Sequence, residues 1–139
     1  MLRSSCLGLS AVVLLSVGCG STLYLAVKGM SPRPPAEVFD CVQKQIPVLG
    51  YDQTSMDAEA HRLTARKYNW ETRFADSRFR RMNERLSIEI GKAEAGAQLK
   101  IAAHTFAELM TQRGPTEVEQ EASAGVKAAA QAIMEACGS

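Results

Sequence analysis

Polar and apolar residues alternate most clearly in two segments near the middle of the chain. Apolar residues occupy alternate positions within the segments 82–90 and 98–106: Leu86, Ile88 and Ile90 in the first, and Leu99, Ile101 and Ala103 in the second. This period of two predicts strands that bury one face and leave the other face in water. The segments 51–56 and 61–68 predict two further strands. We therefore expect four antiparallel strands between residues 51 and 106.

Apolar residues on both sides of this region recur every three or four positions, which is typical of amphipathic helices. The first such stretch begins at Pro35, is interrupted at Pro47 and ends by Gly50. The second follows Gly114: Thr116 and Glu119 match a capping box, and an apolar stripe then continues to Cys137. The order helix, four strands, helix predicts an α+β fold. We expect a two-layer sandwich with both helices on one face of a four-stranded antiparallel sheet.

The first 27 residues carry a single charge, at Arg3, and an apolar run from Leu7 to Val17. This run ends in Ser16-Val17-Gly18-Cys19 and resembles the leader of bacterial lipoproteins. The resemblance implies cleavage before Cys19 and attachment of a lipid to its sulfur. It covers only about the first twenty residues, and Ser16 stands where the family prefers leucine. It predicts a signal peptide over 1–18, a lipid anchor and proline-rich tether over 19–35, and one domain over 36–139.

A retained N-terminal helix is the alternative, because an uncharged run of about 20 residues can cross a bilayer. The chain would then be an accessory subunit of a larger membrane complex. Both interpretations place the domain in the bacterial envelope, held at a membrane and facing the periplasm or the exterior. In lipoproteins an aspartate after the lipidated cysteine signals retention at the inner membrane. Gly20 occupies that position here, so the resemblance favours the outer membrane.

The chain has four cysteines. Cys6 would leave with the leader and Cys19 would carry the lipid, so Cys41 and Cys137 remain in the domain. Both fall on the apolar faces of predicted helices, and an exported protein meets oxidising conditions. We therefore predict a disulfide between Cys41 and Cys137. Two buried, unpaired thiols are the alternative.

Positive and negative charges balance almost completely, with 16 basic and 15 acidic residues. A nucleic-acid-binding domain usually carries a net basic surface, so we expect no nucleic-acid partner. The segment 69–81 nevertheless interleaves aromatic residues with arginines. It predicts a docking patch for an acidic envelope protein, an anionic lipid or an anionic glycan, formed by Trp70, Arg73, Phe74, Arg78, Phe79, Arg80 and Arg81. A solvated loop with its aromatic rings under the sheet edge is the alternative.

Catalytic signatures are missing from the sequence. The two histidines are His61, in a predicted turn after Asp57 and Glu59, and His104, on the outward side of a predicted strand and without an acidic partner in the predicted hairpin turn. We find no nucleophile elbow, zinc-protease motif or phosphate-binding glycine loop. We therefore expect a non-catalytic binding or scaffolding domain without metal or cofactor. An exported hydrolase is the remote alternative.

Overall fold

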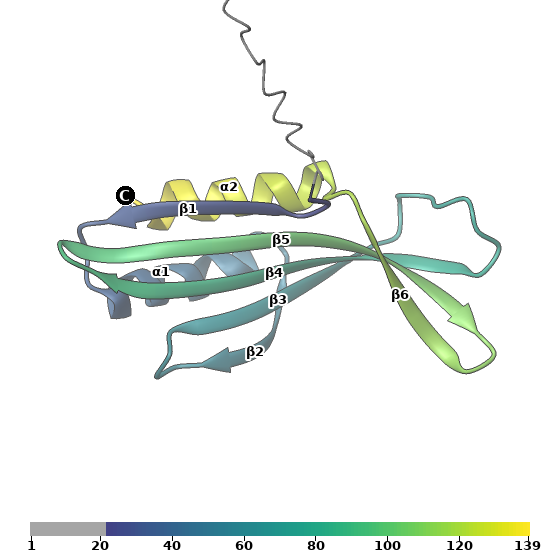
Figure 1. The fold of residues 1–139 in the computed structure, drawn as a ribbon, viewed down its shortest axis with the longest axis horizontal. Coiled ribbons are helices and arrows are strands. Elements are labelled where there is room, and N and C mark those ends of the chain that lie inside the picture. Colours follow the sequence, from purple (N-terminus) through teal and green to yellow (C-terminus); the bar gives the residue numbers. More distant parts are fainter. Residues whose placement is uncertain (1–21) are drawn as a thin grey trace, which may run out of the picture.

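A computed structural model describes residues 22–139 of the chain. The proposed leader, its cleavage site and the proposed lipidation at Cys19 lie outside the described residues. Figure 1 shows the arrangement of the elements. In chain order they are β1 (Leu25–Ser31), α1 (Pro35–Val48), β2 (Asp52–Asp57), β3 (Arg62–Asn69), β4 (Phe79–Ala93), β5 (Gly96–Thr111), β6 (Gly114–Gln120) and α2 (Ala124–Cys137).

Within residues 22–139, six strands form one antiparallel sheet in the order β1-β5-β4-β3-β2, with β6 also paired to β5. The long hairpin of β4 and β5 forms its centre. β1 pairs with residues 97–103 of β5, and β6 pairs with residues 105–111, so two short strands share one edge of β5. The predicted four-stranded sandwich is therefore wrong: the protein is mostly β, with a six-stranded sheet and two helices.

The first additional strand, β1, lies where the sequence predicted a tether. Its side chains alternate: Leu25 and Val27 pack against the core, whereas Ala26 and Lys28 are exposed. Gly29 faces Met134 of α2 so closely that a Cβ would meet the sulfur of that methionine. The strand forms because β5 pairs with β4 along one edge and offers its other edge to residues 25–31. The folded domain therefore begins within the predicted tether, before residue 36.

The second additional strand, β6, lies where the sequence predicted the start of the last helix. The capping-box residues Thr116 and Glu119 are both in β6, and α2 begins only at Ala124. Ser123 caps α2, because its hydroxyl accepts a hydrogen bond from the backbone N–H of Val126 at 3.2 Å. Seven residues of β5 pair with β6. These ladder hydrogen bonds outweigh the capping preference of a single threonine.

Both helices pack against one face of the sheet, and Figure 1 shows them behind β1, β4 and β5. The buried core lies between these layers and includes Val38, Val42, Ile46, Val126, Ala130 and Ile133 from the helices and Leu86, Ile88, Leu99 and Ile101 from the sheet. The predicted disulfide is confirmed. Cys41 of α1 is bonded to Cys137 of α2, with 5.7 Å between their Cα atoms and 96 positions between them in the chain. We call the other side of the sheet the open face.

Candidate docking surface

The predicted docking patch lies in the connection between β3 and β4 and in the first residues of β4. Trp70 directly follows β3 and is 61% exposed. Phe74 and Phe79 are half-buried, and their ring centroids lie 6.1 Å apart. Arg73 is exposed in the loop and forms no ion pair with any residue from 22 to 139. The rings of Phe74 and Phe79 are therefore partly covered, whereas Trp70 lies at the surface.

Three of the predicted arginines pair with carboxylates of the same chain. Arg78 binds Asp76 at 2.8 Å, and Arg80 and Arg81 both approach Glu108, at 3.3 Å and 3.1 Å. Hydrogen bonds from the side chain and backbone of Arg78 lower the pKa of Asp76 to about 2. Because Arg80 and Arg81 share one carboxylate, one positive charge of the three stays uncompensated.

A different set of side chains gathers on the open face of β3 and β4. The guanidinium carbon of Arg81 lies 3.5 Å from the ring centroid of Tyr68 and 5.4 Å from that of Trp70. Arg66 lies over the same tyrosine ring, at 5.0 Å. We call Arg66, Tyr68, Trp70 and Arg81 the arginine–aromatic cluster. The period of two in β3 brings residues 66, 68 and 70 to one face, and β4 supplies Arg81.

The neighbouring part of the open face is an acidic and aromatic network that the sequence did not predict. Glu117 of β6 accepts hydrogen bonds from Arg85 and Asn83, each at 3.0 Å. Glu119 of β6 lies 2.8 Å from Nδ1 of His104, so this histidine has an acidic partner outside the predicted hairpin turn. The sequence did not predict this partner, because residues 116–120 were assigned to a helix. The alternation of Thr116 and Val118 with the two glutamates was the available signal for a strand.

His104 also belongs to a line of stacked rings on this face. Its ring centroid lies 4.7 Å from that of Tyr24 and 5.8 Å from that of Phe106. His61, the other histidine, lies in the turn before β3 with a φ of 49° and packs against the ring of Phe39 at 5.4 Å. Within residues 22–139, no three histidine, cysteine or acidic side chains are grouped as metal ligands would be.

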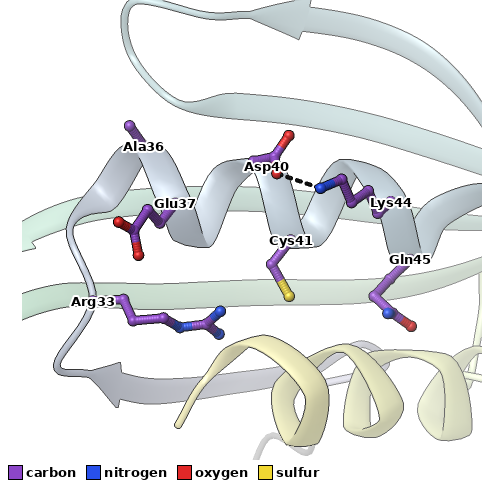
Figure 2. Close-up of a pocket in the computed structure, with 7 residues that line it drawn as sticks. All are labelled: Arg33, Ala36, Glu37, Asp40, Cys41, Lys44 and Gln45. Carbon is purple, nitrogen blue, oxygen red and sulfur yellow. Dashed lines mark ion pairs between the residues drawn. The ribbon is translucent and has the colours of Figure 1, made fainter.

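Three hollows are found on the surface of residues 22–139, one of them at the β5–β6 turn beside Gln112 and Arg113. The largest of these three, about 590 Å³, lies along α1 (Figure 2) and is lined by Arg33, Ala36, Glu37, Asp40, Cys41, Lys44 and Gln45. Two of its cationic groups already have partners: Lys44 binds Asp40 at 2.8 Å, and Arg33 donates to the carbonyl oxygen of Cys137 at 3.1 Å. The second hollow, about 400 Å³, lies beside Trp70 and the N-terminus of α2.

No protein-family model matches the chain, and no curated protein sequence matches it either. Within residues 22–139, neither helix is long and apolar enough to cross a membrane. The leader sequence and the chemistry of the domain surface therefore remain as the indications of function.

Proposed function

We propose that this chain is a membrane-anchored lipoprotein of the bacterial envelope whose domain binds another envelope component without catalysing a reaction. The disulfide between Cys41 and Cys137 is the observation that carries the proposal. Such bonds persist in oxidising compartments and are rare in the cytosol, so the bond supports export. The lipobox-like run ending at Cys19 supplies the means of export and anchoring.

The arginine–aromatic cluster supports a binding role for the domain. Trp70 and Arg66 are exposed, and tryptophan, tyrosine and arginine are the residues most enriched at binding hot spots. The flat rings offer stacking surface, while Arg66 forms no ion pair with any residue from 22 to 139. An acidic protein surface in the envelope fits this combination, because a carboxylate can bind the guanidinium and exclude water beside the rings.

Intact-mass analysis of the native protein, extracted from membranes, tests the anchoring. We expect loss of residues 1–18, a diacylglycerol-modified Cys19 and an oxidised Cys41–Cys137 pair. Cys19→Ser should block both cleavage and lipidation. An uncleaved chain retained in the membrane would favour the accessory-subunit alternative. Free thiols and an intact N-terminus in the soluble fraction would contradict the proposal as a whole.

Crosslinking in intact cells tests the binding role. Trp70→Ala combined with Arg66→Ser should remove the crosslinks that the wild-type domain forms with an acidic envelope protein. The matched control pair, Val48→Ala with Arg113→Ser, removes an exposed apolar side chain and an exposed arginine elsewhere, and should leave them intact. Equal yields from both pairs would show that the cluster does not bind.

A further inference from the structure

Two lysines lie opposite each other on the open face of β1 and β5. Lys28 pairs in register with Lys100, both side chains are exposed, and neither forms an ion pair with any residue from 22 to 139. Glu89 of β4 lies opposite Lys100 on the other side of β5 and offsets part of the positive charge of that lysine. Lys28 lies on β1, an edge strand of the sheet. Like charges directly opposite on antiparallel strands repel each other. An anionic surface laid against this edge would relieve that repulsion.

Exposed apolar side chains flank the first of these lysines. Tyr24 is 38% exposed and Met30 is 57% exposed. Met30 lies two positions from Lys28 in β1, so both side chains point to the open face. Tyr24, just before β1, lies on the same face, because its ring stacks on that of His104. Tyrosine favours the boundary between water and lipid, and the lysine stem can lie along apolar surface while its ammonium group stays in water. A positive charge between two such side chains matches the chemistry of a lipid headgroup layer.

The proposed lipid anchor is joined to the domain close to the start of β1. The carbonyl oxygen of Leu23 accepts a hydrogen bond from the backbone N–H of Ala122 at 2.9 Å, which holds the chain to the domain at that point. Leu23 lies four positions after Cys19. The four residues from Cys19 to Leu23 can span at most about 14 Å. This reach is close to the radius of gyration of about 13 Å expected for a domain of this size, so Leu23 stays within about one domain radius of the proposed anchor.

We propose that the β1 edge, with Tyr24, Lys28, Met30 and Lys100, rests on the anionic phospholipid headgroups of the membrane that holds the protein. The inference rests on the proposed function, since it requires the anchor at Cys19. It places β3 three strand spacings above the bilayer contact, about 14 Å away. The arginine–aromatic cluster therefore stays free for a protein partner.

Acidic side chains at the same edge of β5 do not oppose this contact. Glu117 and Glu119 of β6 are already paired with Arg85 and His104. Figure 1 also shows β6 and the end of β5 running obliquely to the direction of β1. The twist of the sheet thus separates the lysine pair from the acidic strand.

A spin label on the lipidated protein tests the proposed orientation. The protein, with its mass confirmed, is reconstituted into phosphatidylglycerol vesicles or phosphatidylcholine vesicles. One label is placed by Ala26→Cys, on the exposed side of β1, and the control label by Gln131→Cys, exposed on α2. In phosphatidylglycerol, the label at residue 26 should lose access to a water-soluble nickel relaxant several-fold. The label at residue 131 should be equally accessible in both lipids.

Charge variants test whether Lys28 and Lys100 cause the protection of the label at residue 26. Lys28→Gln with Lys100→Gln should restore access at residue 26, because each basic residue near an anionic surface contributes roughly fivefold to its partitioning. Lys44→Gln with Lys127→Gln removes two charges from the helices and should leave the protection unchanged. Salt at about 1 M, where the Debye length is about 3 Å, should also remove the protection. Circular dichroism and an intact disulfide establish that each variant is folded.

Several results would overturn the inference: equal access at residue 26 in both lipids, protection of residue 131 instead, or protection that survives loss of both lysines. Protection that appears only after an acidic envelope protein is added would assign the edge to a protein partner and would also overturn it. A lipidated protein with any of these results keeps the proposed function. A protein without lipid on Cys19 contradicts the proposed function, and the mass measurement distinguishes the two failures.

Discussion

The carboxylate of Glu84, on β4, accepts a hydrogen bond of 2.7 Å from the hydroxyl of Ser123, the residue that caps α2. The same carboxylate accepts a second hydrogen bond, at 3.0 Å, from Tyr51. Gly125 lets the helix approach, because a Cβ at that position would lie 3.1 Å from Oε1 of Glu84. A negative charge is stabilised at the positive end of a helix dipole. Glu84, only 4% exposed, therefore joins the helix layer to the sheet.

Ser123→Ala should lower the free energy of unfolding by about 1–3 kcal/mol, because it removes both the cap of α2 and one hydrogen bond to a buried carboxylate. Urea denaturation of the oxidised protein measures the change. Ser77→Ala, in the exposed part of the β3–β4 loop, is the matched control and should change stability little. Similar losses of unfolding free energy in the two variants would mean that the cap and the contact with Glu84 do not stabilise the domain.

Alkaline pH should destabilise the domain through Tyr51. Burial raises the pKa of this phenol far above its usual value of about 10, and the charge of Glu84 and the hydrogen bond to it raise the pKa further. The folded protein keeps Tyr51 protonated at pH values where the unfolded chain ionises. The stability is therefore complete below about pH 10 and falls as the pH rises above that value.

Tyr51→Phe should flatten this loss above about pH 10, while costing roughly 1.5–3 kcal/mol at neutral pH for the lost charged hydrogen bond. Denaturant unfolding at several pH values gives the slope. Tyr24→Phe, which changes an exposed tyrosine, should keep the wild-type slope. A Tyr51→Phe protein with that same slope would show that another group controls the alkaline transition.

The disulfide should contribute strongly to stability, because it closes a loop between two helices that are distant in sequence. The double variant Cys41→Ser, Cys137→Ser should lose about 4–5 kcal/mol in the chain-entropy treatment of a loop this long. Wild type in reductant should reach the same stability as this double variant. Equal stability of oxidised wild type and double variant would show that helix packing alone holds α1 against α2.

Gly96→Ala should be among the most damaging glycine substitutions. Gly96 begins β5 with a φ of 137°, and an added Cβ would run into the carbonyl oxygen of Ser31 at the end of β1. We expect a loss of at least about 2 kcal/mol from the backbone strain and the collision. Gly91→Ala, where a Cβ would meet no atom within 4 Å, should change stability by no more than about 1 kcal/mol. Thermal melts of the two variants, compared directly, check this ordering.

The arginines illustrate the limit of sequence reasoning about the candidate site. The segment 69–81 concentrates aromatic and basic residues, and Trp70 is exposed there. Arg78 pairs locally with Asp76, but the partner of Arg80 and Arg81 depends on which strand lies beside β4 and how it is registered, since Glu108 comes from β5. Arg66, which joins the cluster instead, lies in a strand whose neighbours no local pattern reveals.

The sequence alone determined the features that follow from local periodicity: α1 and the alternating faces of β4 and β5. It also predicted the disulfide between Cys41 and Cys137, because both cysteines lie on apolar helix faces and an oxidising compartment is expected. Only the tertiary structure decided that residues 25–31 and 114–120 become strands. Both segments have weak intrinsic preferences, and one also carries a helix-capping pattern. The unpaired backbone along β5 supplied the hydrogen bonds that determined their conformation, and that edge exists only after the central hairpin has folded.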